Sequence, residues 1–147
     1  MAAGDTVNAA DTALDAWTTY TPVWSANSGS TVLGNGAITG RYRITGKTGM
    51  LNIGLTWGTT TSATGTGSWA FSLPFTPLAN GLLLAYVDDA SASQRWAGTA
   101  RIIASSSTGD NMRVVMLASN GGINGAANPM TWAANDLLIL HGTLEIA

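Results

Sequence analysis

The sequence predicts an all-β fold: a two-sheet antiparallel sandwich, jelly-roll-like, with about eight strands. Three observations predict it. Apolar and polar residues alternate with a period of two over most segments. Turn signals of Gly, Asn, Ser and Pro recur about every ten residues, and no helical segments alternate with the strands as a parallel α/β fold requires. An immunoglobulin-like sandwich and a small barrel fit the same pattern.

Length and composition indicate one domain. The chain has 147 residues and a formal charge of −2, with 10% charged residues and no cysteine. This length supports one hydrophobic core and leaves little room for a second. We therefore expect a short N-terminal arm, residues 1–16, and a single β-sandwich domain, residues 17–147. Six basic residues are too few to bind a nucleic acid backbone, and a polar, weakly charged surface suits a protein packed in an assembly.

The arm is the one stretch with helix signals. Asn8 and Asp11 are spaced like an N-cap and its N3 partner, and alanines and Leu14 follow. A helix of about nine residues is unstable alone in water, so the arm must pack on its own β domain or on a neighbouring subunit. Whether it is helical or extended stays open. It lacks the basic and apolar regions of a signal peptide, and no apolar run reaches the ~20 residues of a membrane span.

Residues 17–24 predict an edge strand, because three aromatic residues surround Pro22, which cannot donate to a central ladder. A turn-rich stretch, 25–35, leads into the clearest hairpin of the chain, residues 36–57. One face of the hairpin is apolar, and the opposite face carries Arg41 and Arg43. The residues predicted to face the core are Ile38, Tyr42, Ile44, Leu51, Ile53, Leu55 and Trp57. The turn, residues 45–49, holds Lys47, and we expect these three cations to pair with acids on a neighbouring strand or subunit.

The second half predicts further strands in order. The low-complexity stretch 58–68 reads as an exposed loop, either a solvated connector or a tip that contacts a partner. Strands follow at 69–73, 82–87, 95–103 and 112–117. The strand 82–87 is apolar on both faces, which predicts a central position. A second Gly/Asn loop, 119–129, precedes a short strand or connector at 130–132 and a last apolar strand within 136–146.

Catalytic and metal-binding patterns are weak. His141 is the single histidine and lies inside a predicted strand, so a core or face position is favoured over a catalytic base. The acids fall mainly in turns, where turn chemistry explains them, and Asp88–Asp89 lacks the spacing of a calcium loop. We expect no enzyme activity, no cofactor and no metal. A carbohydrate-active enzyme is the weakest alternative.

The six tryptophans divide into two groups by position. Trp57, Trp69 and Trp96 have the parity of strand interiors and are predicted core residues. Trp17, Trp24 and Trp132 lie near edges, where they can face a groove, a neighbouring subunit or a sugar. The candidate interface or partner-contact residues are Leu14, Trp17, Tyr20, Trp24, Arg41, Arg43 and Trp132.

A series of short motifs resembles a module of tailed-bacteriophage virion proteins, found in tail-tip, fibre and other surface proteins of phages that infect actinobacteria. The motifs are Trp17-x-x-Tyr20-Thr21-Pro22-x-Trp24, Leu33-Gly34-Asn35-Gly36, Gly40-Arg41-Tyr42, Gly46-Lys47 and Trp69-x-Phe71-x-Leu73-Pro74. The match covers residues 4–75. The resemblance implies a virion location after assembly in the host cytoplasm, homotrimers, other virion proteins as partners, and no catalytic residues.

The long members of this family carry the module at the end of a fibre, whereas about sixteen residues precede it here. The resemblance therefore predicts a non-enzymatic virion surface protein, either a tail-tip receptor-binding subunit that attaches to the host or a capsid decoration protein that stabilises the head. A host cell-surface glycan is the candidate receptor. Neither nucleic acid nor membrane insertion is expected.

Overall fold

The computed structural model describes residues 16–104, 112–115, 123 and 127–147, and these residues contain eleven β-strands and no helix. The described part of the chain therefore has no helix that could cross a membrane. The predicted helical or extended arm lies outside it, except for Ala16. The strands are β1 (Thr18–Tyr20), β2 (Trp24–Ala26), β3 (Thr31–Val32), β4 (Ala37–Thr45), β5 (Thr48–Thr56), β6 (Ser62–Ala63), β7 (Trp69–Phe71), β8 (Gly81–Asp89), β9 (Gln94–Ile102), β10 (Met112–Val115) and β11 (Leu137–Glu145).

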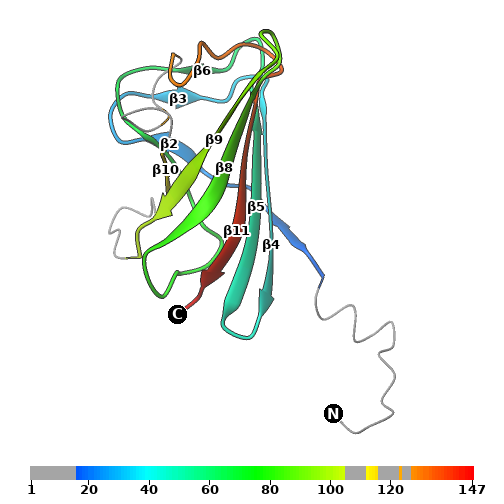
Figure 1. Cartoon of the computed structure of the whole chain (residues 1–147), viewed down its shortest axis with the longest axis vertical. Helices are drawn as coiled ribbons and strands as arrows, with labels where there is room; N and C mark the ends of the chain where they lie inside the picture. The colour runs from blue at the N-terminus through cyan, green and yellow to red at the C-terminus, as the bar shows by residue number, and fades with distance from the viewer. Residues whose placement is uncertain (1–15, 105–111, 116–122, 124–126) are drawn as a thin grey trace, which may run out of the picture.

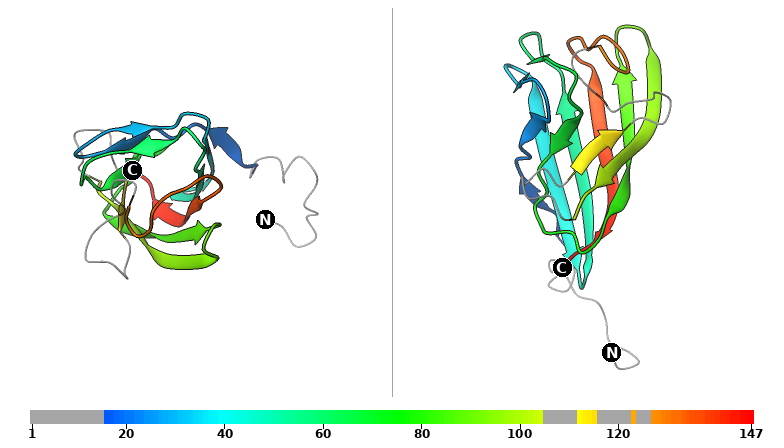
Figure 2. Two further views of the ribbon diagram at one scale, coloured as in Figure 1. Left: turned by 90° about the horizontal axis from the view of Figure 1, so that it is seen from above. Right: turned by 90° about the vertical axis from the view of Figure 1, so that its left-hand side faces the viewer.

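Nine of the strands form one antiparallel sheet in the order β1-β4-β5-β11-β8-β9-β10-β7-β2, and β3 pairs with β6. Five strands of nine residues, β4, β5, β11, β8 and β9, lie side by side as the long layer in Figure 1. The sheet then bends, so that β10, β7 and β2 face this layer across the core, as the end-on view of Figure 2 shows. The predicted all-β sandwich, jelly-roll-like in mixing strands from distant parts of the chain, is confirmed.

The first and last strands of this order, β1 and β2, are consecutive in the chain. β1 pairs with β4 through Tyr20 and Gly40, and β2 pairs with β7 through Trp24 and Phe71. Only residues 21–23 separate β1 from β2, and Pro22, which has no N–H to donate, is buried at the bend. One bent edge segment thus joins the two layers, which is why the aromatic, proline-containing stretch 17–24 forms two strands instead of one.

Gly40 is required at this corner because aromatic and proline rings cover it. A Cβ atom at this position would lie 2.5 Å from Tyr20 Cε1 and 2.8 Å from Pro22 Cγ, closer than van der Waals contact allows. The Tyr20 hydroxyl reaches across to the opposite layer and donates to the carbonyl of Ser72 at 3.3 Å. The corner therefore connects β1, β4 and the end of β7.

The hairpin predicted at 36–57 is confirmed as β4 and β5, with the tight turn at Gly46 and Lys47. Gly46 has a φ of 58°, a conformation that favours glycine. On the inner face of β5, Leu51, Ile53 and Leu55 are buried as predicted. Ile44 is the exception, since it is 41% exposed: it lies one residue from the end of β4, beyond the last residue that β1 covers, Tyr42.

The core is centred on four tryptophans. Trp24, Trp57, Trp69 and Trp132 pack with ring centroids between 4.9 and 5.9 Å apart. Trp57 and Trp69 are buried, as their parity predicted, and Trp96 is half-buried against the core. The large apolar side chains around the cluster come from both layers: Leu51, Ile53, Leu55, Phe71, Val87, Ile102, Ile123, Leu138 and Leu140.

The strand predicted at 82–87 occupies the central position expected of it, between β11 and β9. Its two apolar faces are not both buried, however, because Leu82 and Leu84 are 64% and 60% exposed. The sandwich has two layers, and no described segment forms a third layer over the outer face of β8. The strand at 112–117 is confirmed as β10, whereas 130–132 is a connector and most of the loop 119–129 lies outside the described residues.

Candidate binding surfaces

The two ends of the sandwich differ in what they present. At one end, which we call the loop end, three segments lie together: 27–36, which contains β3, 57–68, which contains β6, and 133–136 (Figure 1). At the other end, which we call the arm end, lie the turn at Gly46–Lys47 and the C-terminal residue, since Ile146 N–H donates to the Lys47 carbonyl at 2.9 Å. The described chain also enters at this end, with Trp17 beside Arg43.

Asn35 fastens two segments of the loop end together. Its Oδ1 accepts from the backbone N–H of Thr60 and from the Thr60 hydroxyl, both at 2.9 Å, while its Nδ2 donates to the Thr59 hydroxyl at 2.8 Å. The Thr60 hydroxyl in turn accepts from the Asn35 backbone N–H at 2.8 Å. These bonds satisfy the polar groups of both segments and hold them in one arrangement.

The predicted loop 58–68 is consequently not a simple exposed connector. Its residues Ser62 and Ala63 form β6, which pairs with β3, and Thr61 and Ala63 are buried. The Thr61 hydroxyl donates to the Leu33 carbonyl, and Thr64 N–H donates to the Ser30 carbonyl at 2.9 Å. The low complexity of the sequence did not predict this pairing, because threonine hydroxyls help to hold the two segments together and give no apolar pattern.

Two carboxylates complete the loop end. Asp136 is fully buried, and its oxygens accept from the backbone N–H groups of Ala90 at 3.0 Å and Ala133 at 2.6 Å. Asp89 accepts from the backbone N–H groups of Ala92 and Ser91 and from the Ser91 hydroxyl. The bond from Ala92 N–H, with the other two, holds the pKa of Asp89 below its ordinary value.

These contacts support the assignment of the acids to turn chemistry. Asp88 lies 3.4 Å from the Arg95 guanidinium, so neither acid of the Asp88–Asp89 pair is directed at a shared metal site. Among the described residues, no group of three or more His, Cys, Asp or Glu side chains converges as metal ligands would. His141 is an exposed face residue of β11, with its Nδ1 3.5 Å from Asn52 Nδ2.

A hollow of about 270 Å³ lies at the loop end, beside the buried Trp57. Its side-chain polar groups come from Asn35, Thr56, Thr59 and Asn135, and none is charged. Asn35 and Thr59 already bond to each other, so the hollow belongs to a preformed, neutral surface.

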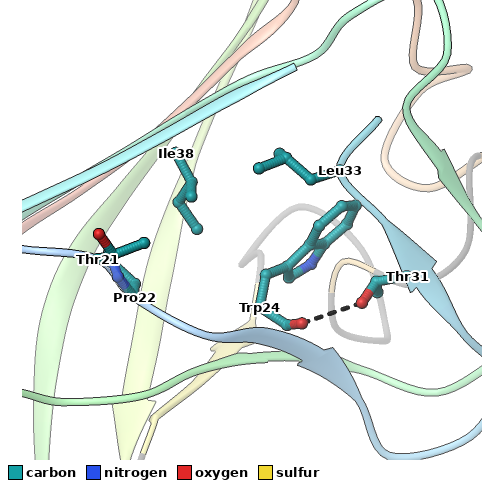
Figure 3. Close-up of a pocket in the computed structure, with 6 residues that line it drawn as sticks. All are labelled: Thr21, Pro22, Trp24, Thr31, Leu33 and Ile38. Atoms are coloured by element: carbon teal, nitrogen blue, oxygen red, sulfur yellow. Dashed lines mark hydrogen bonds between the residues drawn. The ribbon is translucent and has the colours of Figure 1, made fainter. Parts of the chain in front are cut away.

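A groove of about 260 Å³ opens where β1 and β2 diverge (Figure 3). β1 covers β4 only from Gly40 to Tyr42, and β2 turns away to β7, which leaves the first residues of β4 without β1 beside them. The groove is lined by Thr21, Pro22, Trp24, Thr31, Leu33 and Ile38. Trp24 is half-buried, and its carbonyl accepts from the Thr31 hydroxyl at 3.0 Å, so this candidate does line a groove, as its edge position suggested.

At the arm end, Trp17 lies over two guanidinium groups. It is 38% exposed, and the Arg41 and Arg43 Cζ atoms lie 5.1 and 5.9 Å from its ring centroid, within cation–π range. Arg43 also donates from Nη2 to the sulfur of Met50 at 3.0 Å, while its Nε is buried with no hydrogen-bond partner among the described residues.

Among the described residues, the expected pairing of Arg41 and Arg43 with acids on a neighbouring strand is not found. On β5, Arg41 faces Asn52 and Arg43 faces Met50, neither of which is an acid. The cation–indole contact takes the place of an ion pair, because β1 brings Trp17 to this face. Pairing with an acid of another subunit stays a prediction.

The remaining candidates divide between interior and surface. Trp132 is 5% exposed within the tryptophan cluster, so it is a core residue and not a partner contact. Burial raises the pKa of Tyr20, whose ring packs edge-on against Tyr42. Leu14 lies outside the described residues. The sequence did not single out Leu82 and Leu84, the exposed apolar residues of β8, because an apolar run on both faces does not show which face is covered.

No protein-family model, curated protein or solved structure matches this chain.

Proposed function

We propose that this chain is a non-enzymatic structural protein on the surface of a tailed-bacteriophage virion, and that it acts as a trimeric tail-tip subunit that binds the host receptor. The observation that carries the proposal is the difference between the two ends. The arm end holds the chain entry and the Trp17–Arg41–Arg43 surface, whereas the hollow at the loop end is lined by uncharged residues and lies beside cross-bonded loops. Such a molecule can be anchored at its arm end while its loop end stays accessible to a receptor.

The motifs that resemble the phage module support the proposed virion location, since their residues hold this sandwich together. Tyr20, Pro22 and Gly40 form the corner, Trp24 and Trp69 meet in the tryptophan cluster, and Asn35 fastens the loop end. Residues far apart in the sequence thus contribute to one closed sandwich, as the residues of a shared fold module would. The virion location itself rests on the resemblance.

The loop end suits recognition of a neutral partner. Its exposed groups are amides, hydroxyls and glycine backbone, which form hydrogen bonds without charge, as binding to sugar hydroxyls requires. Because Asn35 and Thr60 already fix the two loops, little conformational entropy is lost when a ligand binds. A host cell-surface glycan is therefore the receptor class that we propose.

A capsid decoration protein is the second candidate. The exposed Leu82 and Leu84 favour it, since a flat sheet face with apolar side chains suits lateral contact with a shell. In that case the outer face of the sandwich, and not its loop end, would meet the partner.

Labelled electron microscopy of phage particles tests both candidates. We expect label at the tail tip, and binding of the purified protein to host cell-wall glycan that is lost in Asn35→Ala. Label confined to heads would replace the tail assignment with the capsid one. Label on neither part of the particle would overturn the virion proposal.

A further inference from the structure

The outer surface of the long layer carries a face that the tail-tip assignment does not use. At the arm end of this layer, the register sets Arg41 beside Asn52, Asn52 beside His141, and His141 beside Leu84. Leu82 lies opposite Arg101 on β9. We call this surface the cationic face; it consists of Arg41, Arg43, His141, Leu82, Leu84 and Arg101. It crosses four strand spacings from β4 to β9, about 19 Å.

The cationic face is unbalanced in charge. The ion pair found in the described part of the chain, Arg95–Asp88, lies nearer the loop end, and Arg41 and Arg43 are matched only by the indole of Trp17. Glu145 is at the rim, where it faces Thr48 at the end of β5. Two such faces would repel each other, so a symmetric contact of the face with itself is disfavoured.

Residues 1–15 have the complementary composition. They include Asp5, Asp11 and Asp15, apolar Val7 and Leu14, and no lysine or arginine. Among the other acids that the structure describes, Asp89 and Asp136 are engaged in turns, Asp88 is paired and Glu145 lies at the rim, while Asp110 is outside the described residues. This segment is thus the acidic and apolar stretch that can match a face of cations and exposed leucines.

The direction of β1 favours a neighbouring copy over the same chain. β1 runs antiparallel to β4, so the chain traced backwards from Thr18 follows β4 towards its end at Thr45 and leaves the sheet at the arm end. Fifteen residues can span up to about 50 Å, enough to reach an adjacent molecule.

We propose that residues 1–15 of one copy dock on the cationic face of the next copy, with Asp5 and Asp11 meeting Arg41 and Arg43 and the apolar residues covering Leu82 and Leu84. The contact is head-to-tail, which forms a ring when the rotation between copies closes, and the homotrimer of the proposed function is such a ring. This inference rests on the homo-oligomer of the proposed function and not on the virion location.

Charge reversal in the full-length protein tests the docking. By size-exclusion chromatography with light scattering, we expect the wild type to have a mass that is a multiple of 15.0 kDa. Arg41→Glu with Arg43→Glu, and separately Asp5→Lys with Asp11→Lys, should each weaken association by at least roughly tenfold. Combining all four changes should restore it. The second pair lies outside the sandwich strands, so its effect does not depend on whether the first pair folds.

Matched variants complete the test. Arg95→Glu changes an arginine of the same layer that already pairs with Asp88, and Val32→Ser changes an exposed apolar residue at the loop end. Both should leave the mass unaltered, whereas Leu84→Ser should lower it. Added salt should weaken the association. A wild type that stays monomeric at high micromolar concentration, or an oligomer unaffected by either reversal, overturns the proposal. The mass is independent of particle labelling, so failure of the virion assignment would be seen separately.

Discussion

The tryptophan cluster and the cationic face both contain apolar residues of β-strands, but these residues are buried in the cluster and exposed on the face. Trp69 and Leu84 both occupy apolar positions in strands of the same continuous sheet, yet Trp69 is fully buried and Leu84 is 60% exposed. The cluster lies between two layers, where β7 faces β5, and the cationic face lies on the outside of the long layer. An apolar residue in a strand therefore stabilises the fold only where a second layer covers it.

Of the changes considered, a substitution in the tryptophan cluster should cause the largest loss of unfolding free energy. Trp69→Ala removes a ring that contacts Trp24, Trp57 and Trp132, and should cost about 3–5 kcal/mol of unfolding free energy. Chemical denaturation measures this value. The matched change, Trp17→Ala, removes an exposed ring and should cost less than about 1 kcal/mol. Similar losses at both positions would contradict the assigned roles.

The corner that closes the sandwich should show the next largest effect. Gly40→Ala places a methyl group against Tyr20 and Pro22, which must move, and should cost roughly 1–3 kcal/mol. Gly54→Ala is the control, since on β5 its nearest new contact is the Thr39 hydroxyl at 3.2 Å. If urea denaturation finds Gly54→Ala to be the more damaging change, the packing of Tyr20 and Pro22 over Gly40 is not what closes the sheet.

At the loop end, the contribution of Asp89 should depend on pH. Its folded-state pKa is lowered, so its stabilisation is fully present above the unfolded-state pKa of about 3.9 and is lost as the pH falls through the folded-state pKa. Asp89→Ala should therefore lower Tm at pH 7, and the gap from the wild type should shrink at lower pH. Thermal melts at a series of pH values measure the gap. A gap that stays constant down to a pH of about 2 would show that the hydrogen bonds to the ionised Asp89 carboxylate are not its cause.

The smallest effect on stability should come from the cationic face. Leu84→Ser replaces an exposed side chain, so the unfolding free energy of the monomer should change by less than about 0.5 kcal/mol. Val23→Ser, at another exposed apolar residue, is the comparison. A large loss for Leu84→Ser in a monomeric sample would mean that the face is covered within one chain.

Much of the fold could be predicted from local patterns. The period of two placed β4 and β5 and their turn, and it assigned Leu51, Ile53, Leu55 and Trp57 to the core. It could not identify β3 and β6, because strands of two residues are too short to give a periodic signal. Of the candidate contacts, Trp17, Arg41 and Arg43 meet at one surface, but the sequence could not show that an indole, not an acid, lies over the guanidiniums.

The sequence by itself determined which residues alternate, where the chain turns and that no cysteine could stabilise the fold, since these depend on neighbouring residues and composition. The tertiary structure alone decided that Trp132 is interior, that Leu82 and Leu84 are exterior, and that Pro22 joins two layers over Gly40. The reason is physical: burial in a sandwich depends on which face of a sheet meets the second layer, and contacts between residues distant in the sequence set that choice.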